Sequence, residues 1–422
     1  MPIDEMRRMA RRLFDAAVQA ADPATAVRRY FAEHSAPSPE DSGVTYVIAI
    51  GKAAPAMLGE ALDHIAGPVR ALGVTHRENE HTVPGVEILR AGHPVPDQAG
   101  YNAAQRIIAL LSEVAENDRV VALISGGGSA LIPAPAGDLT LGDKMAVNRL
   151  LLESGLDINV MNLVRQQLSD LKGGGFLRYA APAPVTALIL SDVIGDDLRA
   201  IASGPTVAPL GTSADAMKLL RDNGIWDHLP DRVRSYLSTK KDTAADTPAE
   251  NTLIGSNRVS LAAAHSAATD WDARIADNHL TGDVQTAADK IVRAAVKEAA
   301  KKPTALIFGG ETTVKIKGDG RGGRNQELAL RVAQIADGLL GGHWVFLSGG
   351  TDGRDGPTDA AGGVVDPGTL NRISMAGQDV KALLANNDSY AALKSAGDLL
   401  MTGATGTNVA DVQILLLRPA NG

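Results

Sequence analysis

The sequence predicts an α/β protein of two domains, in which a Rossmann-like domain with a parallel sheet precedes a second α/β domain. The chain has 422 residues, and single hydrophobic cores stop growing at roughly 250–300 residues. Short, continuous apolar runs recur along it, as expected for strands that are buried on both faces. Segments of helical periodicity separate these runs, which is the order of a doubly wound sheet.

The predicted strands share one feature, which is that small or polar residues follow them directly. They cover residues 46–50, 120–124, 185–190, 305–308, 344–347 and, at the end of the chain, 412–417. Helices are predicted between some of them, over residues 284–301 and 325–340. Because ligands of such folds bind beyond the carboxyl ends of the strands, the residues that follow the strands are the candidates for function.

A polar, aperiodic segment over residues 238–250 predicts the division between the domains. We therefore expect an N-terminal domain over residues 1–240 and a C-terminal domain over residues 251–422. Near the N-terminus, Met6, Leu13, Phe14 and Val18 recur at helical spacing and predict a surface helix. Four arginines in this helix raise the alternative of a targeting segment, but acidic residues and the lack of a following apolar run argue against it.

Composition restricts the function. The net charge of −8 argues against general nucleic-acid binding, which needs a dominant basic face. The sequence has no cysteine, so it excludes disulfides, thiolate metal sites and a cysteine nucleophile. No run approaches the roughly 20 apolar residues of a membrane span. We expect a cytoplasmic enzyme that acts on small molecules, with the oligomeric state left open, a homodimer included.

The segment Ser125-Gly126-Gly127-Gly128-Ser129 is the first candidate anion site. Three glycines allow the backbone to approach a ligand and to point several N–H groups at it. A helix that begins there would add the field of its N-terminus. The alternative is a tight turn between a strand and a helix. Lys52 follows another strand and can reach a phosphate as a point charge, or it can be a solvated lysine.

A glycine-rich segment near residue 320 is the most unusual of the chain. Gly318, Gly320 and Gly323 form a literal G-x-G-x-x-G. The preceding residues 313–317 alternate like an exposed strand, whereas the dinucleotide fingerprint needs a buried one. Two arginines favour direct contact with an anion, and Arg324 at a helix start suits a phosphate or carboxylate. A flexible hairpin loop is the alternative.

Asp192 and Asp352 are the first acids after their strands. Carboxylates there can hold Mg²⁺ or accept a proton from a hydroxyl group, although turn formation and helix capping are the alternatives. His93, in a proline-rich loop, is assigned a structural role. Asn408 either binds substrate or shapes a turn. The sequence contains no P-loop, H-E-x-x-H or G-x-S-x-G motif, which argues against a P-loop kinase, a zinc protease and an α/β-hydrolase.

Short motifs run in a fixed order through nearly the whole chain. They are Ile50-Gly-Lys-Ala-Ala54, Gly92-His-Pro-Val-Pro-Asp97, Ser125-Gly-Gly-Gly-Ser-Ala130, Leu168-Ser-Asp-Leu-Lys-Gly-Gly-Gly175, Ser191-Asp-Val-Ile-Gly-Asp-Asp197, Gly204-Pro-Thr206, Gly310-Glu-Thr312, Gly322-Gly-Arg-Asn-Gln-Glu327, Thr351-Asp-Gly353 and Gly406-Thr-Asn408. Together they resemble the MOFRL-type glycerate 2-kinase family, which is also catalogued as hydroxypyruvate reductases.

The resemblance implies a fold and a reaction. It implies two α/β domains with the active site in the cleft between them, and ATP-dependent phosphorylation of D-glycerate at the 2-hydroxyl. The products would be 2-phosphoglycerate and ADP, and a divalent metal ion would take part. At Gln166-Gln167 the chain departs from the family pattern, where a basic or histidine-containing stretch is expected.

The resemblance also assigns residues. It gives the functional lysine as Lys52, the functional arginine as Arg324, and acidic and amide positions as Glu311, Asp352 and Asn408. We add Asp192 as the candidate base. Mg²⁺ is expected at one or more of Asp192, Glu311 and Asp352. On this interpretation Arg324→Ala should reduce turnover severely while leaving the fold intact.

Two other functions stay open at this point. One is an NAD(P)H-dependent hydroxypyruvate reductase, against which stands the missing fingerprint after the first strand. The other is a non-catalytic sensor that binds a small anion without turnover.

Overall fold

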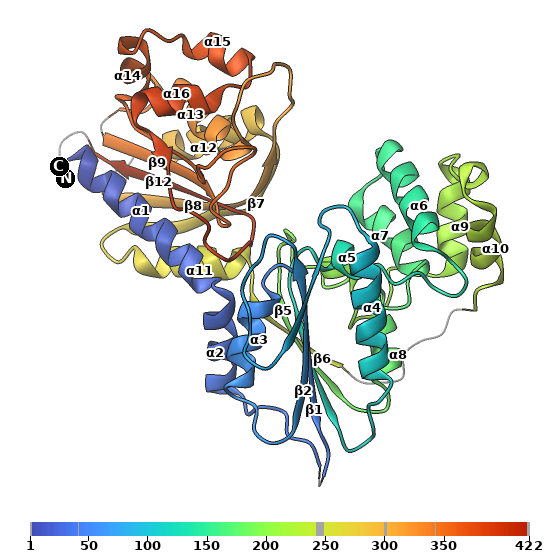
Figure 1. Cartoon of the computed structure of the whole chain (residues 1–422). Coiled ribbons are helices and arrows are strands. Elements are labelled where there is room, and N and C mark those ends of the chain that lie inside the picture. Colours follow the sequence, from blue (N-terminus) through green and yellow to red (C-terminus); the bar gives the residue numbers. More distant parts are fainter. Residues whose placement is uncertain (1, 41, 242–248, 299–301, 342, 420–422) are drawn as a thin grey trace. The chain divides into compact units, whose positions relative to one another are not determined.

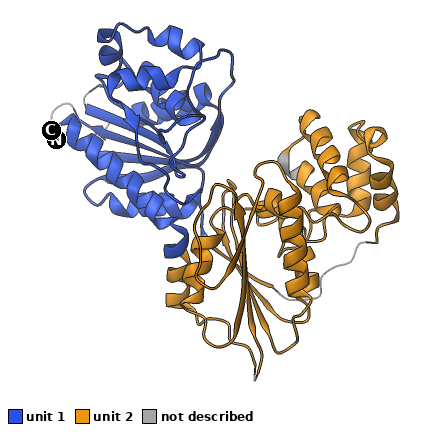
Figure 2. Ribbon diagram, viewed as in Figure 1, with its two compact units in different colours: residues 1–25, 255–422 blue, residues 26–254 orange. Residues whose placement is uncertain are grey.

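The computed structural model describes residues 2–40, 42–241, 249–298, 302–341 and 343–419. The chain forms two compact units (Figure 2). Unit 1 contains residues 1–25 and 255–422, and unit 2 contains residues 26–254. Both are α/β structures, each built on a six-stranded sheet, which confirms the predicted fold class.

Unit 2 has the Rossmann strand order. Its sheet runs β3-β2-β1-β4-β5-β6, the order in which dinucleotide-binding sheets are wound. The pairs β2–β3, β1–β2, β1–β4 and β4–β5 are parallel, as predicted. The strands are β1 (Thr45–Ile50), β2 (Val69–His76), β3 (Glu87–Ala91), β4 (Arg119–Ile124), β5 (Val185–Leu190) and β6 (Ala249–Gly255).

Helices cover both faces of this sheet (Figure 1). One face packs against apolar residues of α4 (Gln98–Leu111) and α8 (Gly175–Ala180), and α3 (Ala54–Leu62) packs on β1 and β2. A further group of helices has a small core of its own. It includes α6 (Leu141–Glu153), α7 (Ile158–Gln167), α9 (Ser213–Asp222) and α10 (Asp231–Thr239). Unit 2 also contains most of α2 (Pro23–Glu33), and α5 (Gly128–Leu131), η1 (Ile201–Ser203) and η2 (Trp226–His228).

The sheet of unit 1 is mixed. Its order is β11-β10-β9-β12-β8-β7, and β12 lies antiparallel between β8 and β9. The continuous apolar runs, which are typical of parallel sheets, thus also occur in this mixed sheet. A continuous apolar run reports burial on both faces, and burial does not depend on strand direction. The strands are β7 (Asp272–Asp283), β8 (Thr304–Thr313), β9 (His343–Gly350), β10 (Gly362–Val365), β11 (Leu399–Leu400) and β12 (Asp411–Arg418).

Two helical layers also cover the sheet of unit 1 (Figure 1). The two cores on its faces involve different helices. The helices are α1 (Ile3–Ala20) and α11 (Asn257–Ala267) on one face, and α12 (Val284–Glu298), α13 (Arg324–Ala336), α14 (Thr369–Met375), α15 (Val380–Ala385) and α16 (Ser389–Ala396) on the other. The helix predicted over residues 325–340 is thus shorter than expected. Residues 299–301, at the end of the helix predicted over 284–301, lie outside the described residues. Residues 314–317, which were predicted to be part of an exposed strand, form no strand.

The compact units divide the chain differently from the prediction. Helix α1 belongs to unit 1, because Met6, Leu13 and Phe14 are buried in a core with strands β8, β9 and β12. Periodicity shows that a helix has an apolar face but cannot show which sheet that face covers. Strand β6 belongs to the sheet of unit 2, so the chain returns to unit 1 only at the end of this strand. Most of the predicted linker, residues 242–248, lies outside the described residues.

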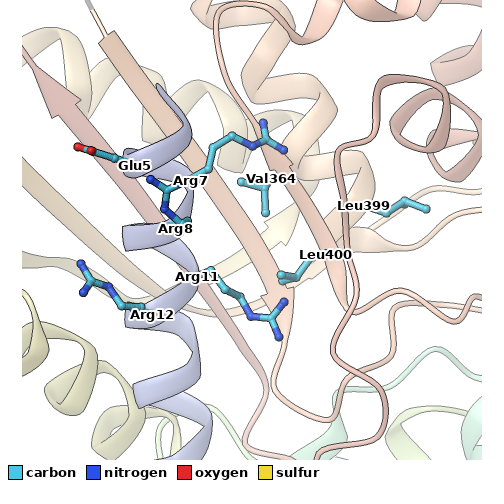
Figure 3. Close-up of a pocket in the computed structure, with 8 residues that line it drawn as sticks. All are labelled: Glu5, Arg7, Arg8, Arg11, Arg12, Val364, Leu399 and Leu400. Atoms are coloured by element: carbon cyan, nitrogen blue, oxygen red, sulfur yellow. The ribbon is translucent and has the colours of Figure 1, made fainter. Parts of the chain in front are cut away.

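An ion-pair cluster also fixes α1. Arg7 pairs with Asp366 and, at 2.9 Å, with Asp398, and both carboxylates are buried. Arg372 binds the same two acids at 3.0 and 2.8 Å. Figure 3 shows that Arg7, Arg8, Arg11 and Arg12 border one pocket beside Val364, Leu399 and Leu400. The arginine that pairs with these acids therefore has a structural role.

In the part of the chain that the structure describes, we find no helix with the length and apolar character that a membrane crossing requires.

The packing of α1 makes a testable prediction. Phe14→Ala should destabilise unit 1 by about 3–5 kcal/mol, because a fully buried aromatic ring is replaced by a cavity. Native-state hydrogen exchange should show faster exchange in residues 255–422. Phe31→Ala, at a half-buried position of α2, is the matched control and should act within residues 26–254. Loss of protection in unit 2 alone on substitution of Phe14 would contradict the assignment of α1.

Candidate functional site

Two strand ends of unit 2 are bound to each other. Gly51 has a φ of 127°, and a Cβ atom there would lie 2.2 Å from the hydroxyl oxygen of Ser125. The amide of Lys52 donates to the carbonyl of Gly126 at 2.9 Å, and the amide of Ala53 donates to the Ser125 hydroxyl at 3.1 Å. The glycine at position 51 thus permits the contact. The Ser125 side chain, predicted to bind phosphate, holds the two turns together.

The glycine loop lies against the predicted functional side chains of unit 2. A Cβ atom on Gly126 would lie 2.1 Å from a carboxylate oxygen of Asp192. One on Gly127, which has a φ of 83°, would lie 3.1 Å from Lys52 and 3.2 Å from His93. The structure therefore brings Lys52, His93 and Asp192 together around these two glycines. The helix that follows, α5, has only four residues, so it supplies much less field than the expected helix N-terminus.

The surroundings shift the proton affinities of this group. Burial, the Lys52 charge and His76 lower the pKa of His93 to about 4, so the imidazole is neutral at pH 7. Burial raises the pKa of Asp192 above its ordinary value, and this effect exceeds the opposite effect of Lys52. His93, assigned a structural role from the sequence, is thus a member of the site.

A buried lysine contacts the last residue of the glycine loop, and the sequence analysis did not select this lysine. The ammonium group of Lys172 donates to the carbonyl and the hydroxyl of Ser129, at 2.8 and 2.9 Å. The Ser129 hydroxyl also lies 2.9 Å from that of Ser203. Lys172 precedes Gly173 and Gly174, both of positive φ. The signal available in the sequence was a lysine directly before three glycines. This lysine belongs to one of the motifs quoted above, but no functional role was assigned to it.

A cavity of about 530 Å³ opens beside Ser129 and Lys172. Its lining also includes Gly127, His93, Lys144 and Arg165. All of these residues belong to unit 2. The predicted glycine loop therefore forms part of the wall of a cavity that contains basic groups.

The departure at Gln166-Gln167 has a structural explanation. Both side chains are buried. Gln166 donates to the carbonyls of Arg199 and Ser203 at 3.0 and 3.1 Å and accepts from the amide of Leu210 at 2.8 Å. Amides suit these positions, because buried backbone groups need hydrogen-bond partners. The glutamines hold loops, and the basic residue Arg165 directly precedes them.

In unit 1, Arg324 begins α13, as predicted, but carboxylates already engage it. Its guanidinium forms a two-pronged contact with Asp411, at 2.6 and 3.0 Å, and a third contact with Glu311 at 2.7 Å. Asp411 is fully buried at the start of β12. Sequence reasoning missed Asp411, because only the strand pairing places it beside β8.

This ion pair changes the expectation for Arg324. Burial by itself lowers the pKa of Arg324, but the contacts with Asp411 and the charges of Glu311 and Asp355 raise it above its ordinary value. The guanidinium is thus held charged, and its removal leaves Asp411 buried without its partner. The expectation that Arg324→Ala leaves the fold intact does not agree with this arrangement.

The other predicted residues of unit 1 lie in turns. Asp352, after β9, accepts a hydrogen bond from the amide of Arg354 at 3.0 Å, and Asn408 accepts one from Ala410 at 3.4 Å. Both side chains are partly exposed, so a ligand can still reach them. Asp355 accepts hydrogen bonds from the first amides of α13, and burial raises its pKa to about 6. It therefore caps this helix.

The G-x-G-x-x-G segment does not form a dinucleotide loop. A Cβ atom on Gly318 or Gly320 would lie 2.2 to 2.4 Å from atoms of Asn386. One on Gly323 would lie 2.2 Å from Asp355. These glycines are thus explained by close packing within unit 1.

The predicted metal ligands belong to different units. Asp192 lies in unit 2, and Glu311 and Asp352 lie in unit 1. Within the described ranges, no three His, Cys, Asp or Glu side chains gather as a metal site. Magnesium is commonly held by one or two carboxylates together with substrate phosphates, so single carboxylates of this set fit such an ion only in the company of a phosphate ligand.

Comparisons with known proteins agree with the resemblance in the sequence. Residues 9–238 match a family model described as a domain of unknown function, DUF4147, and residues 304–411 match the MOFRL family. The crystal structure of a glycerate kinase from Thermotoga maritima superposes with a TM-score of 0.90 at 38% identity, covering 98% of this chain and all of that one.

Curated relatives carry two kinds of name. The D-glycerate 2-kinase of Thermotoga maritima is 41% identical over 88% of this chain and 90% of its own length. The glycerate 2-kinase of Pyrococcus horikoshii is 37% identical over 99% of both chains. A protein of Agrobacterium vitis, provisionally named a hydroxypyruvate reductase, is 41% identical over 97% of this chain and 94% of its own. The chain therefore belongs to the DUF4147–MOFRL family, the family of these glycerate 2-kinases.

Proposed function

We propose that the protein is a glycerate 2-kinase, which transfers the terminal phosphoryl group of ATP to the 2-hydroxyl of D-glycerate. One observation carries the proposal beyond the relatives' names. Lys52 and the glycines Gly126 and Gly127 meet where β1 and β4 end. This is the point where the strand order of the sheet reverses, and there α/β folds bind their ligands. We further propose that the reaction takes place in the cytoplasm and involves no nucleic acid.

In unit 2 the proposed roles follow from charge. The Lys52 ammonium neutralises charge on the transferred phosphoryl group, and backbone N–H groups of residues 126–128 donate to phosphate oxygens. Asp192 accepts the proton of the 2-hydroxyl. Its raised pKa suits that task, because a base works best with a pKa nearer to the operating pH. A neutral His93 adds no positive charge beside Lys52.

In unit 1 the proposed roles involve the partly exposed groups. Arg324, whose side chain is 36% exposed, binds the carboxylate of glycerate or a phosphate. Glu311 and Asn408 bind substrate, and Asp352 contributes to catalysis. Asp411 is a positioning residue, which acts by orienting the guanidinium. Such residues suit phosphoryl transfer, in which catalysis is mostly positioning and electrostatic stabilisation.

Mg²⁺ is the proposed metal. Asp192, Glu311 and Asp352 are the candidates to hold it, and Glu311 is the weakest, because it already pairs with Arg324. A bound magnesium ion would neutralise charge on the nucleotide phosphates.

Hydroxypyruvate reduction is the second candidate. It is favoured by the dinucleotide-type strand order of unit 2 and by the provisional name of relatives. Against it, β1 ends in Gly51-Lys52 without the glycine fingerprint, and the only literal fingerprint follows residues 314–317, which form no strand.

Product analysis tests the proposal. Purified protein incubated with D-glycerate, ATP and Mg²⁺ should form 2-phosphoglycerate, identified by ³¹P and ¹³C NMR. Lys52→Met should lower kcat by about 100-fold or more, because a charge that stabilises the transition state is lost. Lys218→Met, on the exposed surface of α9, is the matched control. Formation of 3-phosphoglycerate would refute the assigned hydroxyl, and NADH oxidation by hydroxypyruvate without phosphoryl transfer would refute the kinase.

Arg324 gives a second prediction, which separates its two roles. Arg324→Ala should lower kcat/KM and also reduce the free energy of unfolding by roughly 1–3 kcal/mol, because Asp411 stays buried without a partner. In the double variant Arg324→Ala and Asp411→Asn, stability should partly return and activity should not. Urea unfolding and initial rates measure the two effects. If Arg324→Ala is as stable as the wild type, the pair of Arg324 and Asp411 has no structural role.

A further inference from the structure

Three basic side chains near the glycine loop lack acidic partners. Lys144, Arg165 and Lys172 line the same cavity. Among the described residues, we find no ion pair between any of them and an aspartate or glutamate. Their protein contacts are neutral oxygens: the carbonyl of Leu168 for Lys144, the amide oxygens of Asn148 and Asn162 for Arg165, and the carbonyl and hydroxyl of Ser129 for Lys172. Lys172 is buried, and Lys144 and Arg165 are partly exposed. Clustered charges of one sign are costly when they are withdrawn from water, unless something neutralises them.

The proton affinities agree with mutual repulsion. Burial, with Arg165 and Lys240 nearby, lowers the pKa of Lys144 to about 7, even though Asp170 acts in the opposite direction. Burial and the charges of Lys144 and Arg165 lower the pKa of Lys172 well below its ordinary value. An anion in the cavity would relieve this repulsion, so the site favours a ligand with several negative charges.

Part of the cavity lining is apolar. It includes Val95, Met145 and Leu152, and each is an exposed large apolar side chain, at 62%, 38% and 58%. Apolar groups this exposed are typical of ligand-binding surfaces when they border a concave site. One acid, Glu153, also lines the cavity. The cavity lining thus offers both cations and apolar surface.

From these features we infer that this cavity of unit 2 is the nucleoside triphosphate site, with phosphates at Lys144, Arg165 and Lys172 and the base against Met145 and Leu152. The inference rests on the proposed kinase function. A volume of about 530 Å³ lies within the usual range of about 300–1,000 Å³ for small-molecule sites. A three-carbon acid would leave most of that volume empty and the apolar surface uncovered.

The ligand would also reach the site described above. Ser129 and Gly127 belong both to the cavity lining and to the glycine loop. The lining further includes His93, whose imidazole lies near Gly127 as Lys52 does. A nucleotide bound with its phosphates toward Lys172 would therefore direct its phosphate chain along the glycine loop.

Two other cavities are weaker candidates for the nucleotide. The one at α1 has an arginine, Arg7, that two buried acids already neutralise (Figure 3). The one near Lys315, Lys317 and Lys381 also contains Asp283 and Glu327. In both, acidic side chains of the protein contact or lie beside some of the basic groups.

Calorimetric titration of the full chain tests the inference, with the non-hydrolysable analogue AMP-PNP, adenosine and D-glycerate as separate probes in the presence of Mg²⁺. Lys144→Gln should weaken AMP-PNP by about 10- to 100-fold, because a charge-assisted contact is lost. The affinities for adenosine and D-glycerate should change by less than about twofold, since neither molecule carries a phosphate that could contact the Lys144 ammonium group. Leu152→Glu should weaken adenosine and AMP-PNP alike. Lys218→Gln, on exposed α9, should change nothing.

The outcomes separate the two levels of the proposal. If the wild type binds AMP-PNP and neither variant weakens it, the kinase stands and this cavity is not its nucleotide site. If Lys144→Gln weakens D-glycerate and spares AMP-PNP, the cavity holds the acid, which overturns the inference. If the wild type binds no nucleotide at all, the proposed function itself fails. Both substitutions are at partly exposed or exposed positions, and thermal melting checks that each variant is folded.

Discussion

The contact between the ends of β1 and β4 is the constraint on which the rest of unit 2 depends. Gly51 lets the backbone approach Ser125 within a distance that any side chain would prevent. Once the two turns are joined, the amide of Lys52 is bonded to Gly126 and its side chain lies beside Gly127. Asp192, from the end of β5, closes on the same loop. The chemistry of this region is therefore a consequence of how closely backbones can pack.

The two units stabilise their positively charged side chains in different ways. In unit 1 the guanidinium of Arg324 is oriented by a buried carboxylate, and its side chain remains partly exposed. This arrangement is suited to hold a rigid fork toward an anion. In unit 2 the buried lysine Lys172 contacts only neutral oxygens within the described chain, and in our proposal a ligand supplies its partner charge. Each unit thus offers positive charge to an anion by a different physical means.

Much of the fold could be predicted, because the spacing of apolar residues shows which faces of the helices and strands are buried. The six strands inferred from apolar runs exist, and α12 and α13 begin within one residue of the predicted positions, although α13 ends earlier than predicted. Strand direction in unit 1 could not be predicted, since burial is the same for parallel and antiparallel strands. In the site, Lys52, Arg324 and Asp192 stand at element ends, where sequence shows them. Asp411 and Lys144 could not be selected, because their importance comes from contacts with residues distant in sequence.

We propose that the glycine loop of unit 2 receives the phosphates of ATP. Hydrogen–deuterium exchange of the backbone amides of residues 125–131, with and without AMP-PNP and Mg²⁺, tests it most directly. These amides should exchange more slowly in the presence of the nucleotide, because their N–H groups would donate to phosphate oxygens. Unchanged exchange in this loop, with protection confined to residues 318–326 of unit 1, would contradict it.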